Sequence, residues 1–177
     1  MVREIRIGRI ANLSFRVQPS ALAGTVLLWS VLSWAARGVL HLSLWEALQF
    51  GLLATIAHWA LDLIHQLGHA WAANSTGYPM IGIRFWWVLS TCLYPSNEPE
   101  LPEHIHVRRA LGGPALSLGV LILAAIWSWL VWPPVGVVEW LGIFISVDSL
   151  LTFTLGAFLP LGFTDGSTLL RLWRNRE

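Results

Sequence analysis

The stretch LDLIHQLGHAWAANSTGYP, residues 61–79, carries two histidines four positions apart in an otherwise apolar segment. In an α-helix, a separation of four places His65 and His69 on the same face, about 6 Å apart along the axis. Two imidazoles so arranged can fill neighbouring corners of a tetrahedral metal site. The stretch therefore predicts an apolar helix with a candidate metal-binding face.

The whole sequence has the composition of an integral membrane protein. Of its 177 residues, 55% are hydrophobic and only 12% are charged, which lies outside the usual range of soluble domains. Twelve tryptophans suit two interfacial belts. The single cysteine, Cys92, excludes an intrachain disulfide and a cysteine-based zinc cage. A net charge of +1 gives no indication of nucleic-acid binding. We expect one membrane domain over residues 1–177, with the lipid bilayer as its surroundings.

Four apolar stretches are long enough to cross a bilayer, which takes roughly 20 residues. The second opens at Ser43, with Glu46 at the spacing of a capping box. Prolines follow the third and fourth stretches, and a short helix is expected over 164–177. The predicted spans cover about 21–40, 44–73, 107–132 and 135–159.

The distribution of arginine predicts the orientation of these spans. All eleven basic residues are arginines, and an N-terminus inside the cell leaves only Arg37 outside. We therefore expect the surface segment 1–18 and the tail helix to be cytoplasmic. The expected location is the plasma (inner) membrane.

Two segments outside the spans have the character of strands. Residues 80–95 are rich in β-branched and aromatic side chains, which predicts one or two strands at the cytoplasmic membrane surface. Weak alternation within residues 1–18 predicts a short hairpin, with an interfacial amphipathic helix as the alternative. The expected fold is an all-α membrane protein of about four helices, with a small β element between the second and third.

Four ionisable side chains share one stripe of the second span: His58, Asp62, His65 and His69 fall within about 60° of one another. Such groups are costly inside a membrane, and they usually mark a site. A buried hydrogen-bonded network between helices is the alternative. His58 lies two turns before His65, so a structural role outside the coordination sphere is expected. Asp62 is placed to accept the free ring N–H of His65 and fix its tautomer.

A catalytic metal needs a third protein ligand, and Asp165 is the main candidate. It follows the break at Pro160, on the same side of the membrane as the end of the second span. Capping of the terminal helix is the other role that its position allows. His104 and His106, at the start of the third span, are rival ligands, although their i, i+2 spacing does not suit one helix face.

Three motifs, taken in order, resemble the site-2 protease family of intramembrane zinc metalloproteases, the M50 group. HQLGHA (65–70) is similar to that family's His-Glu-x-x-His helix, and LGGPALSL (111–118) to its glycine-proline motif. FLPLGFTDG (158–166) is similar to its proline-then-Asp-Gly segment. With the N-terminal IGRIANLSFRVQPS (7–20), the resemblance extends over nearly the full chain.

The resemblance implies a single Zn²⁺ ion held by His65, His69 and Asp165, with water as the fourth ligand. It also implies structural roles for three residues of the later motifs, Gly113, Pro114 and Pro160. The family's substrates are membrane-spanning segments of other proteins. The strands at 80–95 are then placed to pair with an unwound segment by edge addition.

Departures from the family pattern bear on catalysis. Gln66 stands in place of the general-base glutamate, and an uncharged amide cannot accept a proton from water. Ser117 and Ala157 stand where asparagines are usual. The prediction is an intramembrane zinc metallopeptidase that Gln66 weakens or inactivates. The alternative is a zinc-binding pseudoprotease that binds transmembrane helices of partner proteins.

Two further hypotheses concern the remaining acidic and histidine side chains. Asp62, Glu100 and Glu103 are candidates for a replacement base. The other hypothesis is a haem-binding electron carrier that uses His58 or His65 as an axial ligand. The third and fourth spans proper contain no histidine that could act as its partner.

Overall fold

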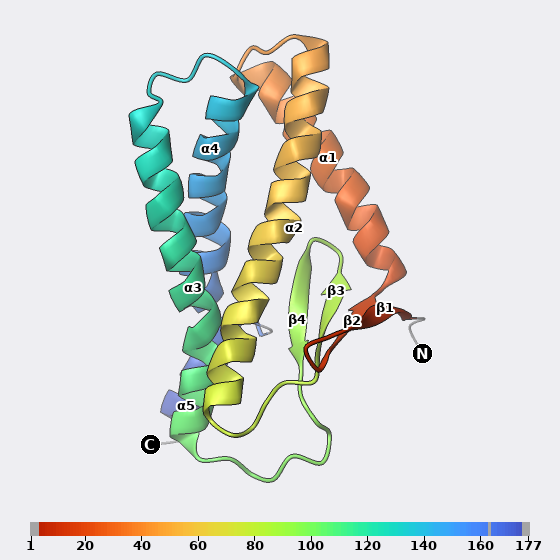
Figure 1. The fold of residues 1–177 in the computed structure, drawn as a ribbon, viewed down its shortest axis with the longest axis vertical. Helices are drawn as coiled ribbons and strands as arrows, with labels where there is room; N and C mark the ends of the chain where they lie inside the picture. The colour runs from red at the N-terminus through yellow and green to blue at the C-terminus, as the bar shows by residue number, and fades with distance from the viewer. Residues whose placement is uncertain (1–3, 163, 175–177) are drawn as a thin grey trace.

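Four long apolar helices form the framework of the computed structural model, which describes residues 4–162 and 164–174 (Figure 1). Each helix has the length and composition needed to cross a membrane. Their bounds are Pro19–Val39 for α1, Leu44–Ser75 for α2, Glu103–Leu130 for α3 and Val137–Phe158 for the last. The bounds of these helices agree with the predicted spans to within a few residues. The third differs most, because α3 begins at Glu103 and so includes both His104 and His106.

The fourth span changes its helical form along its length. It starts as α4 (Val137–Asp148), continues as a π-helical segment (Ser149–Leu155) and ends in one 3₁₀ turn (Gly156–Phe158). After the break at Pro160 the chain turns back into α5 (Asp165–Arg174). The return is tight, since a β-carbon on Gly166 would lie 2.0 Å from the Phe158 carbonyl oxygen. Residues 175–177 of the predicted tail helix, and 1–3 of the surface segment, lie outside the described residues.

Within residues 4–162 and 164–174, one four-stranded sheet accompanies the helices. Its strands are β1 (Ile5–Ile10), β2 (Leu13–Val17), β3 (Gly82–Trp86) and β4 (Leu89–Leu93), in the order β1-β2-β3-β4. The N-terminal hairpin is confirmed, and the amphipathic-helix alternative is wrong. The small β element predicted between the second and third helices is confirmed as β3 and β4. β2 pairs in parallel with β3, which unites the two hairpins.

The β3–β4 hairpin lies alongside α2 (Figure 1). The Val88 carbonyl in its turn lies 2.7 Å from Nε2 of His58, seventeen residues before the end of α2 at Ser75. That is about 25 Å along the helix axis. The turn also packs against α1, where a β-carbon on Gly24 would lie 1.9 Å from the Trp87 carbonyl oxygen.

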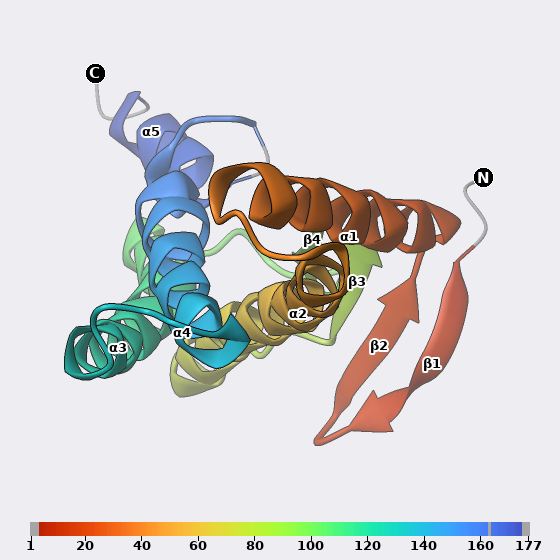
Figure 2. The same cartoon turned by 90° about the horizontal axis from the view of Figure 1, so that it is seen from above.

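Helix α2 occupies the centre of the molecule. Figure 2 shows α3 and α4 on one side of it, with α1 and the N-terminal hairpin on the other. The α2–α3 crossing is close because glycines meet there: a β-carbon on Gly68 would lie 2.3 Å from the Gly112 carbonyl oxygen. This crossing brings the histidine face of α2 against the glycine-proline motif of α3.

Candidate metal centre

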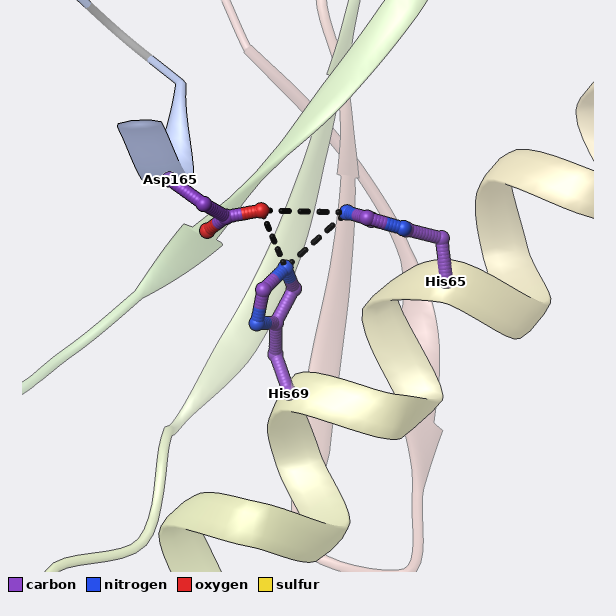
Figure 3. A group of neighbouring side chains, drawn as sticks. All are labelled: His65, His69 and Asp165. Carbon is purple, nitrogen blue, oxygen red and sulfur yellow. Dashed lines mark hydrogen bonds and ion pairs between the residues drawn. The ribbon is translucent and has the colours of Figure 1, made fainter. Parts of the chain in front are cut away.

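His65, His69 and Asp165 converge on one point at the junction of α2 and α5 (Figure 3). Their facing atoms form a triangle, with Nε2 of His65 and Nε2 of His69 separated by 3.0 Å. Oδ2 of Asp165 lies 3.5 Å from Nε2 of His65 and 3.4 Å from Nε2 of His69. The two histidines are buried and the aspartate is largely so, with 17% of its side chain exposed.

The dimensions of this triangle suit a zinc ion. With ligand bonds of about 2.0–2.1 Å, the corners of a tetrahedron lie about 3.3–3.4 Å apart. Each imidazole presents a lone pair at Nε2 when its ring proton is on Nδ1, and three lone-pair atoms converge stably only around a proton or a cation. The group can therefore hold a metal ion, and a tetrahedral one fits its shape.

The opposite ring nitrogens of both histidines bond to α3. Nδ1 of His69 lies 2.8 Å from the Arg109 carbonyl oxygen and must donate to it, which leaves Nε2 as the acceptor. Nδ1 of His65 lies 3.0 Å from Oγ of Ser117. The prediction that Asp62 orients His65 is therefore wrong. Ser117, on the neighbouring helix, holds that ring nitrogen.

Gly113 lies directly against both imidazoles. A β-carbon there would lie 2.3 Å from Nε2 of His69 and 2.6 Å from Nε2 of His65. One face of α3 contacts both imidazoles through residues spaced four apart. Arg109 supplies the acceptor carbonyl, Gly113 leaves space for the rings, and Ser117 supplies the hydroxyl. The adjacent Pro114 is buried inside the same helix. The sequence motif thus marks a close approach of backbone to ligand side chains.

Asp165 reaches the histidines because of the turn that follows Pro160. It is the first residue of α5, and its carboxylate points to the imidazoles and away from the α5 backbone (Figure 3). The ligand position is thereby favoured over the helix-cap alternative. Among the described residues, the rivals from α3 do not join the group: His106 lines the adjoining cavity, and His104 is exposed.

The amide of Gln66 is engaged with β4. Its Nε2 donates to the Ser90 carbonyl at 3.2 Å, and its Oε1 accepts from the Cys92 thiol at 2.9 Å. Burial is the main cause that raises the pKa of Cys92 to about 12, so this group is a neutral thiol. Asp62 also reaches β4, where its Oδ1 accepts from the Ser90 amide at 3.2 Å. Ala157, also buried beside the centre, has no polar side-chain atom.

His58 belongs to a separate network, as its position two turns away predicts. Its Nδ1 lies 2.9 Å from Oδ2 of Asp148, and its Nε2 binds the carbonyl at the hairpin turn. Oγ1 of Thr152 donates to the other Asp148 oxygen at 2.7 Å. His58 therefore connects α2, the fourth span and the β3–β4 turn.

A cavity of about 590 Å³ opens beside the three converging side chains. Asp62, His65, Gln66 and His69 line one wall, and the edge of β4 lines another. Pro160 itself is exposed and marks the turn at one end. The cavity is large enough to hold a peptide segment next to the candidate metal centre.

One buried cation organises the rim of this cavity. Arg109 binds both carboxylate oxygens of Glu98 at 2.6 and 2.9 Å, and donates to the Tyr78 carbonyl. Its guanidinium carbon lies 4.2 Å from the centre of the Tyr94 ring. Hydrogen bonds from Arg109 lower the pKa of Glu98. Burial raises the pKa of Tyr94. Arg109 thus attaches the loop that contains Glu98 to α3.

Sequence reasoning did not identify the structural roles of Ser117 and Arg109. In the sequence, Ser117 stands out only as a departure from the family pattern, and Arg109 is one of eleven arginines that serve only to predict orientation. Their spacing of four on either side of Gly113 was the available signal.

Comparison with known structures supports the resemblance that the motifs predict. The site-2 protease from Methanocaldococcus jannaschii has a similar structure, with a TM-score of 0.68 and 16% sequence identity. The similarity covers 99% of this chain and 73% of that chain. No protein-family model and no curated protein matches the sequence. The chain is an integral membrane protein with the fold of a site-2 protease.

Proposed function

We propose that this chain binds one zinc ion and uses the site-2 protease architecture to bind membrane-spanning segments of other proteins. In this proposal, cleavage of those segments is much weakened or lost. The zinc ligands are His65, His69 and Asp165. The observation that carries the proposal is the convergence of three candidate ligand atoms, 3.0–3.5 Å apart, beside a large cavity.

The remaining residues around the site are arranged to prepare these ligands. Arg109 and Ser117 fix the two rings so that both Nε2 atoms face the centre, and Gly113 leaves room for them. A bound zinc ion supplies Lewis acidity, which lowers the pKa of a coordinated water to about 7. These features support metal binding independently of any catalytic activity.

Gln66 supports weak or absent hydrolysis. A general base must accept a proton, and the amide of Gln66 has no such capacity and is already bonded to β4. General acid–base catalysis is typically worth about 10²- to 10⁴-fold in rate, so its loss leaves binding as the main function. Glu98 is held by Arg109, and Glu100 is exposed and does not line the cavity.

Peptide hydrolysis with Asp62 as the base is the second candidate function. Oδ2 of Asp62 is buried without a hydrogen-bond partner among the described residues, and Asp62 lines the same cavity. It lies one helical turn from His65 and Gln66, so a bridging water would have to relay the proton. Asp62→Asn would abolish cleavage under this candidate.

The proposal is tested by metal analysis and by a cleavage assay on the full chain in detergent. We expect about one zinc per wild-type chain and none in His65→Ala or Asp165→Ala, with His58→Gln as the control that retains it. Equal zinc in all four proteins contradicts the proposed site. Cleavage of a reporter membrane segment by Gln66→Glu but not by the wild type supports the binding function. Efficient cleavage by the wild type supports the enzyme.

A further inference from the structure

The backbone of Ser90 lies on the outer edge of the sheet. β4 is the terminal strand next to β3, and Ser90 is opposite Phe85 in their antiparallel register. The Ser90 N–H donates to Asp62, and its carbonyl accepts from Gln66. Both backbone groups are therefore directed away from β3, at the edge where a further strand could add.

Asp62 and Gln66 form the hydrogen bonds with the Ser90 backbone that a neighbouring strand would form. A paired strand offers one carbonyl acceptor and one N–H donor to each such residue. Asp62 offers an acceptor at 3.2 Å, and Gln66 offers a donor at 3.2 Å. Asp62 and Gln66 lie four apart on α2, so both can reach a single residue. Their exposures are only 1% and 5%, which makes the contact a buried one.

The Cys92 thiol fixes which way the Gln66 amide points. Because the thiol donates to Oε1, the NH₂ group of the amide is left to face the Ser90 carbonyl. A glutamate at this position has no N–H to donate, and its carboxylate would face that carbonyl oxygen with like partial charge. The contact therefore depends on the glutamine that replaces the family's base.

We propose that Asp62 and Gln66 together cap the Ser90 segment of the β4 edge and exclude an extended peptide backbone from it. In a strand, the backbone N–H and C=O groups of residues 90 and 92 point to the same side. With Ser90 capped, a bound peptide therefore has to pair with the strand nearer to Cys92. The inference rests on the proposed function, in that a peptide binds along this edge. It adds that the glutamine at position 66 blocks part of the β4 edge, in addition to leaving the site without a general base at that position.

The first test is hydrogen–deuterium exchange of the full-length protein in detergent. In the wild type the Ser90 amide is protected, and in Asp62→Leu it exchanges about tenfold faster, as expected for the loss of one charge-assisted bond. Thr55→Val is the matched control, because Thr55 is equally buried in α2 but bonds only to its own helix. A wild-type Ser90 amide that exchanges as fast as an unprotected one overturns the cap.

The second test asks where a peptide binds. A leucine-rich synthetic peptide with a benzophenone group is photo-crosslinked to each protein, and the labelled residues are mapped by mass spectrometry. We expect several-fold more label at residues 89–91 in Gln66→Glu and Asp62→Leu than in the wild type or Thr55→Val. Gln66→Glu preserves side-chain shape, so the test stands if Asp62→Leu does not fold. Equal label at 89–91 in all proteins, or none there in the variants, overturns the proposal.

Zinc content measured on the same preparations separates this inference from the proposed function. A wild type without zinc contradicts the proposed metal site. The exchange rate of Ser90 and the position of the label still decide whether the cap exists.

Discussion

Gly113 faces His69 so closely that a β-carbon on the glycine would lie 2.3 Å from the ring nitrogen Nε2. Real β-carbons do not approach other atoms at this distance, so any side chain at position 113 must displace the imidazole. The glycine of the α3 motif is thus part of the candidate metal centre through the space that it leaves.

Gly113→Ala should remove zinc while the protein still folds. The added methyl group displaces both Nε2 atoms, and zinc coordination tolerates deviations of only about 0.2 Å. Gly119→Ala, on the same helix, is the control because a β-carbon there meets nothing within 4 Å. That control should keep its zinc and gain up to about 1 kcal/mol in helix stability. Zinc content is measured on both purified variants, and full zinc in Gly113→Ala would contradict the assignment.

Ser117→Ala should weaken zinc binding without abolishing it. The hydroxyl lies 3.0 Å from Nδ1 of His65, and loss of such an orienting partner typically lowers metal affinity about 10- to 100-fold. Competition with a zinc chelator measures the affinity. Ser30→Ala, which alters only a bond within α1, serves as the control. An unchanged affinity in Ser117→Ala would show that the hydroxyl does not orient the ligand.

His58→Leu should destabilise the fold while leaving the zinc content unchanged. The substitution leaves the buried Asp148 carboxylate without its histidine and releases the Val88 carbonyl at the hairpin turn. Removing one member of a buried pair typically costs about 3–5 kcal/mol. Thermal unfolding in detergent measures the loss, and metal analysis of the folded protein checks that His58 is not a ligand. A variant as stable as the wild type contradicts this role.

Arg109→Ala should release the loop between β4 and α3. Glu98, the Tyr78 carbonyl and the Tyr94 ring all lose their shared partner. We expect protease cleavage within residues 95–102 to accelerate several-fold. Arg108→Ala provides the comparison, because Arg108 is exposed and neighbours Arg109 in sequence. Equal cleavage of the two variants would show that Arg109 does not retain the loop.

Acid should release the same loop by protonating Glu98. Hydrogen bonds from Arg109 lower its pKa below the ordinary 4.5. A carboxylate with a lowered pKa stabilises the folded arrangement fully above its ordinary value, and that contribution is lost as the pH falls through the lowered one. A nitroxide on Ser96→Cys should stay ordered from neutral pH to 4.5 and become mobile only below that value. Adding Glu98→Gln should make the label mobile at every pH. A transition above pH 4.5 contradicts the assignment.

The sequence alone determined the helices, most of their ends and the face of α2 that carries the candidate metal ligands. These properties are local: apolar length sets a membrane span, and a spacing of four sets a helix face. His65 and His69 could be selected because ionisable groups are rare and costly within apolar spans. Asp165 could be selected because it follows the break at Pro160, on the same side of the membrane as the end of the second span. The motif order also predicted the fold that the structural similarity shows.

Only the tertiary structure decided which groups hold these side chains. Ser117, and not Asp62, contacts Nδ1 of His65. Asp62 and Gln66 both bond to the backbone of Ser90. The parallel pairing of β2 with β3 likewise joins segments almost seventy residues apart. Each of these contacts depends on how two elements distant in sequence approach one another, and side-chain spacing within one element carries no information about that approach.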